Sequence, residues 1–155
     1  MKGDPVVIEK LNELLAEELT AINEYMVEAE MCENWGYERL HEAIQKIAIE
    51  EMKHAESLIQ RIIFLEGIPA VSKLNQLHIG ADVEKMHANG LMGEITAVAG
   101  YNQGMRICTE ANDNGTRELL KNILKDEEEH IDWLEAQIDQ IKQMSLPIYL
   151  AGQAK

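Results

Sequence analysis

Hydrophobic residues recur every three or four positions along four long stretches of the chain, separated by polar or glycine-containing breaks. This spacing places apolar side chains on one face of a helix. In the first stretch Ile8, Leu11 and Leu15 follow it, after an Asp4-Pro5 pair that is typical of a helix start. The pattern predicts helices at about residues 5–34, 37–66, 82–112 and 116–144, and a short tail helix at about 146–152.

The connections indicate how these helices pack. The break at residues 35–37 is short, whereas residues 67–81 have turn residues at both ends and no helical period. A connection of that length can cross the whole bundle, so the third helix can run parallel to the second. Asp82 is the expected N-cap of the third helix, and Thr116 that of the fourth, after a turn at residues 113–115. The prediction is an all-α four-helix bundle in one domain, with a long crossover and a short C-terminal fifth helix.

Two features of the predicted helices stay open at this level. The tail after Pro147 is apolar and too short to fold alone, and we expect it to pack against another subunit. Gly90, Gly93, Gly100 and Gly104 lie inside the third helix, where each costs ~1 kcal/mol relative to Ala. Close packing or local flexibility would explain them.

Composition narrows the class of protein. At 155 residues the chain suits a single core, and 46% hydrophobic with 27% charged residues is ordinary for a globular protein. A net charge of −14 argues against nucleic-acid binding and suits a protein that attracts cations. No apolar run reaches membrane-spanning length and no signal peptide is visible, so we expect a cytoplasmic protein. Cys32 and Cys108 are expected to be free, buried thiols.

The strongest chemical pattern is a repeated set of acidic and histidine residues. Glu51 and His54 lie three residues apart, on one side of a helix, where both can hold one metal ion. Glu127 and His130 repeat the pair 76 residues later. A lone glutamate precedes each pair by 33 residues, namely Glu18 and Glu94. The surrounding sequence repeats as well, including Tyr25 and Tyr101, which indicates an internal duplication.

A single Glu-x-x-His pair is weak evidence for a metal site, because the chain contains other matches to this pattern. Glu38 with His41 and Glu84 with His87 also match, but neither pair recurs at the 76-residue offset, and both are expected on solvated helix faces. Two lone glutamates plus two Glu-x-x-His pairs on four helices are the ligand set of a di-metal site in a bundle core. Glu128, Glu129 and His78 are not expected to be ligands.

The donor types indicate the metal and the chemistry. Glu18, Glu51 and His54 are expected to serve one metal and Glu94, Glu127 and His130 the other, with one glutamate of each pair able to bridge both. Carboxylates with one imidazole per metal suit Fe(II) or Mn(II) better than a structural zinc. Two irons held close together can pass two electrons to dioxygen or peroxide.

Several motifs together resemble bacterioferritin over essentially the whole chain: Met1-Lys-Gly-Asp4, Glu51-Met-Lys-His54, Phe64-Leu-Glu-Gly67 and His130-Ile-Asp-Trp-Leu-Glu135. The resemblance implies a ferritin-like bundle that assembles into a hollow cage of about 24 subunits with closed symmetry. It also implies ferroxidase activity at the six predicted ligands, iron storage as ferric mineral, and a redox role for Tyr25. A tyrosine that only hydrogen-bonds a site carboxylate is the alternative.

The resemblance further implies a b-type haem shared by two subunits through Met52, which at helical pitch points away from Glu51. The residues expected to line the haem pocket are Leu19, Ile22, Asn23, Met26 and Ile49. Lys46 and Glu50 stand where some relatives carry an accessory iron site, which is therefore expected to be weak or absent. A ferredoxin electron donor and a second type of bacterioferritin subunit are further expected partners.

Two other functions remain in play from sequence. One is a non-storing di-metal oxidase or peroxidase of the ferritin-like class, and the other is an electron-transfer subunit in which the haem matters most. A small DNA-protecting ferritin is disfavoured by the acidic charge and by a ligand set contained in one chain.

Overall fold

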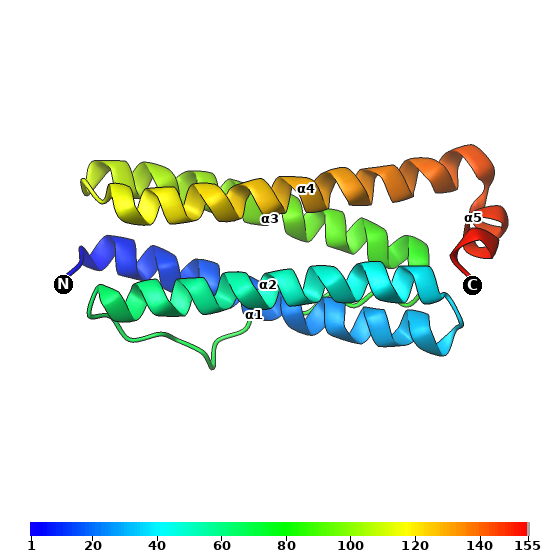
Figure 1. Cartoon of the computed structure of the whole chain (residues 1–155), viewed down its shortest axis with the longest axis horizontal. Coiled ribbons are helices and arrows are strands. Elements are labelled where there is room, and N and C mark those ends of the chain that lie inside the picture. The colour runs from blue at the N-terminus through cyan, green and yellow to red at the C-terminus, as the bar shows by residue number, and fades with distance from the viewer. Residues whose placement is uncertain (155) are drawn as a thin grey trace.

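The computed structural model describes residues 1–154, and within them the chain forms five α-helices and no strand. Four long helices make the bundle shown in Figure 1: α1 (Pro5–Asn34), α2 (Glu38–Phe64), α3 (Val83–Glu110) and α4 (Asn114–Met144). A short α5 (Leu146–Gln153) follows at the end where α4 finishes. The predicted all-α fold class is confirmed.

The crossover between α2 and α3 runs back along the outside of the bundle (Figure 1). Consequently α2 and α3 point in the same direction, while α1 and α4 point the opposite way. The crossover is held against α1 by polar contacts: Asn12 Oδ1 accepts from the Ala70 amide at 2.8 Å, and Thr20 Oγ1 accepts from the Asn75 amide at 2.9 Å.

Side-chain caps start three of the helices. Asp4 accepts from the Val6 amide at 2.8 Å, and Asp82 accepts from the Lys85 amide at 2.8 Å. The predicted Thr116 cap is wrong: Asp113 is the N-cap of α4, and its Oδ1 accepts from the Thr116 amide at 2.9 Å. The turn also lies earlier than predicted, with Asn112 at φ 57°, a left-handed conformation that asparagine tolerates.

The apolar core is divided into two parts. Val7, Leu11, Leu58 and Leu120 belong to a cluster near the N-terminus of α1, and Ile44 belongs to a second cluster toward the other end of the bundle. Between the two clusters lies a belt of buried polar residues. The two apolar clusters thus fix the spacing of all four helices around this belt.

The C-terminal helix α5 is anchored within its own chain rather than only through another subunit. Tyr149 is buried, its hydroxyl donates to Gln137 Oε1 at 2.8 Å, and His87 Nε2 lies 3.0 Å from the same hydroxyl. The expectation that His87 lies on a solvated face is therefore wrong, because α5 covers it. Burial lowers the pKa of His87 to about 4, so the ring is neutral.

The second unrepeated pair also differs from expectation. His41 is only partly exposed; its Nδ1 lies 2.9 Å from the Ala29 carbonyl oxygen and its Nε2 lies 2.7 Å from Glu33 Oε2. The ring therefore links α2 to the end of α1. Neither unrepeated Glu-x-x-His pair belongs to a metal-ligand cluster among the described residues.

The glycines of α3 have two different surroundings. A Cβ added at Gly104 would lie 2.9 Å from Leu120 Cδ1, and one added at Gly100 would lie 3.2 Å from Leu14 Cδ2, so close packing explains both positions. At Gly93 no described atom lies within 4 Å of an added Cβ. Gly93 therefore leaves open space beside the polar belt.

Candidate metal centre

The six predicted ligands come together from the four long helices. Glu18 comes from α1, Glu51 and His54 from α2, Glu94 from α3, and Glu127 and His130 from α4, and all six are buried. Ligand atoms of Glu18, Glu51, His54 and Glu127 lie within 4.8 Å of one another. Those of Glu51, Glu94, Glu127 and His130 form a second such group. Glu51 and Glu127 belong to both groups, so they are the two carboxylates able to bridge a pair of ions.

The inward-facing atoms of this cluster lack hydrogen-bond partners. These atoms are Glu18 Oε2, Glu51 Oε1, Glu94 Oε2, both carboxylate oxygens of Glu127, and Nδ1 of His54 and His130. His54 Nδ1 lies 2.9 Å from Glu127 Oε1 and His130 Nδ1 lies 3.0 Å from Glu51 Oε1, close but without hydrogen-bond geometry. Buried polar atoms left unpaired are costly, and cations between them would satisfy all of them. The donor set therefore fits a pair of divalent metal ions.

The pKa values of the cluster also fit a site for divalent metal ions. Burial and the neighbouring Glu18 charge raise the pKa of Glu51 well above its usual value and that of Glu127 to about 10. Burial alone would lower the pKa of His54, but the nearby carboxylates of Glu127 and Glu18 raise it to about 11. Without a metal the cluster therefore holds extra protons. Divalent cations can take their place, so metal binding should release protons.

A second pair of carboxylates orients the two histidines from outside. His54 Nε2 lies 2.9 Å from Asp126 Oδ2, and His130 Nε2 lies 2.6 Å from Glu50 Oε2. An outer carboxylate that accepts from Nε2 leaves Nδ1 directed inward as a ligand. Sequence reasoning missed this role, although Glu50 and Asp126 also lie 76 residues apart. Glu50 is thus occupied by His130, with Lys46 Nζ 3.9 Å away from its other oxygen.

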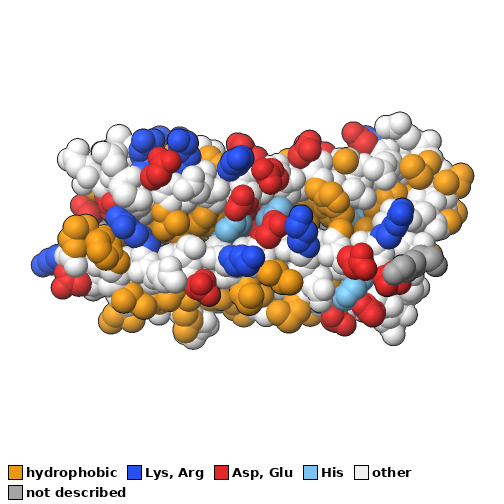
Figure 2. All heavy atoms as spheres, viewed as in Figure 1, with side chains coloured by type: hydrophobic (Ala, Val, Ile, Leu, Met, Phe, Trp, Pro, Cys, Tyr) orange, Lys and Arg blue, Asp and Glu red, His pale blue; other side chains and the backbone are white. Residues whose placement is uncertain are grey.

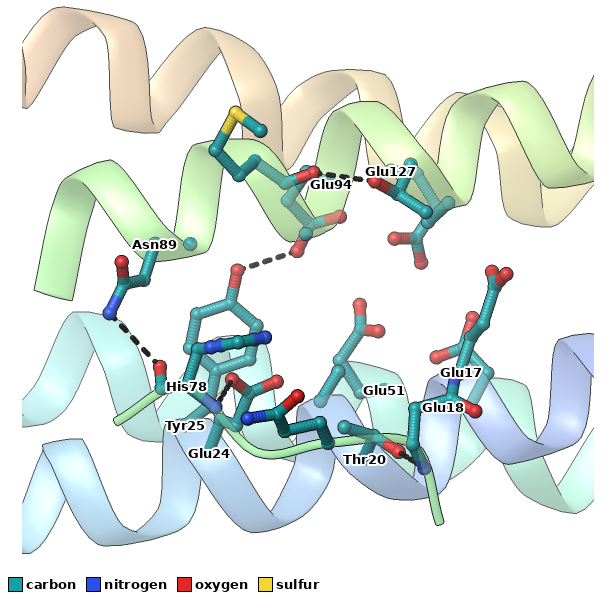
Figure 3. A pocket seen from close by; sticks show the side chains of 18 of the residues that line it. Glu17, Glu18, Thr20, Glu24, Tyr25, Glu51, His78, Asn89, Glu94 and Glu127 are labelled. Carbon is teal, nitrogen blue, oxygen red and sulfur yellow. Dashed lines mark hydrogen bonds between the residues drawn. The ribbon is translucent and has the colours of Figure 1, made fainter. Parts of the chain in front are cut away.

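Two buried tyrosines bind the lone glutamates. Tyr25 donates to Glu94 Oε1 at 2.7 Å (Figure 3), and Tyr101 donates to Glu18 Oε1. Burial and the surrounding carboxylates raise the pKa of both phenols well above the ordinary value, so both remain donors. The internal repeat pairs Tyr101 with Tyr25. Sequence reasoning assigned Tyr101 no role, although this pairing could have indicated one.

A cavity of about 480 Å³ leads to the cluster between α1, α3 and the crossover. Four of the six candidate ligands line it, and Figure 3 shows Glu17 and Glu24 along its wall on α1. The His78 backbone closes one side, because its amide donates to Glu24 Oε2 at 2.7 Å and its carbonyl oxygen accepts from Asn89. The cavity is therefore an access space beside the candidate metal centre, with acidic side chains along its wall.

Beside the candidate ligands, the acidic residues of the cavity wall have raised pKa values, Glu24 among them. Burial raises the pKa of Glu17 to about 7. Burial, with a smaller contribution from Glu24, raises the pKa of Glu28 to about 8. Glu28 is only 3% exposed. These groups can release protons near neutral pH when a cation enters.

The residues predicted to bind haem lie on the outside of the α1–α2 pair. Met52 is 52% exposed, and Met26 and Ile49 are exposed as well. Leu19, Ile22 and Asn23 are partly buried beside them. Figure 2 shows hydrophobic side chains along the lower edge of the view, where α1, α2 and the crossover lie. We call Met26, Ile49 and Met52 the exposed apolar patch.

No helix within the described part of the chain is both long enough and apolar enough to cross a membrane. The bundle and its buried carboxylate–histidine cluster are those of a ferritin-like protein, and the family model for the ferritin-like domain matches residues 8–144. Bacterioferritin from Brucella melitensis is 43% identical over 139 residues, covering 90% of this chain and 86% of the relative. Those from Mycobacterium leprae (38%, covering 97% and 95%) and Rhodobacter capsulatus (41%, covering 89% and 86%) are similar too. The chain belongs to the bacterioferritin family.

Proposed function

We propose that the protein stores iron, oxidising Fe(II) to Fe(III) at the candidate metal centre and keeping the product as mineral inside a cage of identical subunits. The observation that carries the proposal is the cluster of unpartnered carboxylate oxygens and imidazole nitrogens, in two groups that share Glu51 and Glu127. Such a set holds two ions close enough to react together. Two bound Fe(II) ions supply two electrons to dioxygen or peroxide.

The chain's own residues have distinct tasks in this reaction. Asp126 and Glu50 hold the two imidazoles with Nδ1 inward. Tyr25 orients Glu94 through its hydrogen bond and donates an electron during the oxidation. The cavity beside Gly93 gives Fe(II) a path to the carboxylates, and the acidic wall attracts it. Glu17 and Glu28 are placed to take up or release the protons that accompany ion entry.

The exposed apolar patch supports the rest of the proposal. A cluster of exposed apolar side chains on a bundle surface suits contact with a partner. Met52 in the patch offers a thioether that suits haem iron, and Met52 from a second copy would hold the same haem. The haem would carry electrons to the stored Fe(III) for iron release, received from a ferredoxin.

Substitution of single ligands tests the proposal. In Glu18→Ala and in His130→Ala we expect loss of rapid Fe(II) oxidation, followed by absorbance after mixing with oxygen, while size-exclusion chromatography shows an intact assembly. Glu129→Ala is the matched control, because Glu129 is exposed on the same helix as His130. Oxidation at the wild-type rate in both ligand variants would refute the proposal.

A further inference from the structure

We infer that Tyr101 is a second electron donor of the metal centre, the counterpart of Tyr25 across the internal repeat. The inference rests on the proposed ferroxidase function and deepens it. With both tyrosines as donors, one turnover at the centre can reduce dioxygen to water.

The geometry relates the two tyrosines by the same duplication as the ligands. Tyr25 follows Glu18 by seven residues on α1, and Tyr101 follows Glu94 by seven residues on α3. Each hydroxyl donates to the lone glutamate of the opposite helix: Tyr25 to Glu94, and Tyr101 to Glu18. Each candidate metal position therefore has one phenol that is hydrogen-bonded to its unshared glutamate, Glu18 or Glu94.

The environment of Tyr101 distinguishes it from a tyrosine that serves packing alone. Tyr101 is 0% exposed and lies in the apolar cluster formed by residues such as Leu11 and Leu14. A phenylalanine would fill that space equally well. Among the hydrogen bonds of the described residues, the Tyr101 hydroxyl makes the one to Glu18. Tyr149 is also buried, but its hydroxyl is bound by Gln137 and His87, away from the centre.

Reduction of dioxygen to water takes four electrons, so two donors are needed beside two Fe(II) ions. Two Fe(II) ions reduce dioxygen only to the level of hydrogen peroxide. With two phenols the balance is O2 + 2 Fe(II) + 2 TyrOH + 2 H⁺ giving 2 Fe(III) + 2 TyrO• + 2 H2O. The O–O bond breaks, and each phenol loses one electron together with the proton it shares with Glu18 or Glu94. One electron from a further Fe(II) and one proton from water return each radical to the phenol.

Electron paramagnetic resonance of samples frozen milliseconds after mixing with Fe(II) and oxygen tests the inference. Tyr25→Phe should keep a tyrosyl radical signal, and Tyr25→Phe with Tyr101→Phe should lose it. Tyr25→Phe with Tyr149→Phe is the matched control and should keep it. The inference is overturned if Tyr25→Phe alone abolishes the signal while oxidising Fe(II) rapidly, or if the Tyr25/Tyr101 double variant retains it.

Two further readouts separate electron donation from a structural role. Metal-free Tyr101→Phe should still bind two Co(II) per subunit, measured by visible absorbance. If that binding is lost, 3,5-difluorotyrosine at position 101 in the Tyr25→Phe background preserves the hydroxyl, and fluorine splitting of the radical signal is then expected. An unsplit signal would overturn the inference. Absence of rapid Fe(II) oxidation in the wild type would instead refute the ferroxidase proposal.

Discussion

At the scale of single residues, the candidate metal centre depends on side chains that do not themselves face the ions. Glu50 and Asp126 contact the outer nitrogens of His130 and His54. An imidazole free to rotate would present Nδ1 in several directions, so these carboxylates preorganise the site. Their contribution can be measured without any turnover.

Asp126→Asn and Glu50→Gln are expected to weaken Co(II) binding by about 10- to 100-fold, because an amide accepts more weakly and no longer complements the metal-bound imidazole. Isothermal titration calorimetry on metal-free protein measures the affinity. Glu128→Gln, at an exposed position of α4, is the control and should bind as the wild type does. Unchanged affinity in both test variants would mean that the outer carboxylates do not position the rings.

Glu28 should make the stability of the metal-free protein pH-dependent. Its folded-state pKa is raised from 4.5 to about 8, so the folded state holds a proton that the unfolded state has lost between these values. Stability contributed by that proton is therefore lost as the pH rises toward 8. Relative to wild type, Glu28→Gln should gain stability from pH 5 to pH 8.5, by up to a few kcal/mol at about 1.4 kcal/mol per pKa unit.

Urea unfolding at the two pH values measures this gain. Glu110→Gln, at the exposed C-terminal end of α3, is the control and should show no comparable change with pH. A stability difference between Glu28→Gln and wild type that stays constant from pH 5 to pH 8.5 would contradict the raised pKa.

At the scale of elements, α3 combines glycines that serve packing with one that opens space. Gly93→Ala should raise the free energy of unfolding by up to about 1 kcal/mol, because alanine favours the helix and the added methyl group meets nothing among the described atoms. Gly104→Ala should be the less stable of the two, since its Cβ would press on the buried Leu120. Chemical unfolding of the metal-free variants compares them; the reverse order would contradict this account of α3.

The helices and the ligand cluster could be predicted because both depend on short, regular spacings. Helical periodicity located the four long helices, and the 76-residue repeat selected the six residues that the structure brings together. Long-range packing could not be predicted in this way. His87 is buried because α5 folds back over it, and Glu50 and Asp126 reach histidines of another helix. The predicted start of α4 is wrong because Asp113 and Thr116 are both residue types that cap helices well. In the structure the Thr116 hydroxyl donates a hydrogen bond to Asp113 Oδ2.

At the scale of the whole molecule, the exposed apolar patch and the buried centre lie on different sides of α2. Met52→Leu should therefore remove the haem absorbance band while rapid Fe(II) oxidation continues, because leucine keeps the apolar surface and lacks a ligand atom. Met92→Leu is the control, since Met92 is exposed on α3 outside the patch. Haem retained in Met52→Leu, measured by absorbance of purified protein, would show that Met52 is not its ligand.

The central claim is that Fe(II) is oxidised at a two-ion site and then stored. Stopped-flow absorbance of the metal-free protein, given increasing Fe(II) per subunit under oxygen, tests it most directly. The account predicts a fast phase that saturates near two irons per subunit, followed by slower and continued uptake. A fast phase without later uptake would indicate a non-storing oxidase, and the absence of any fast phase would contradict the six-ligand centre itself.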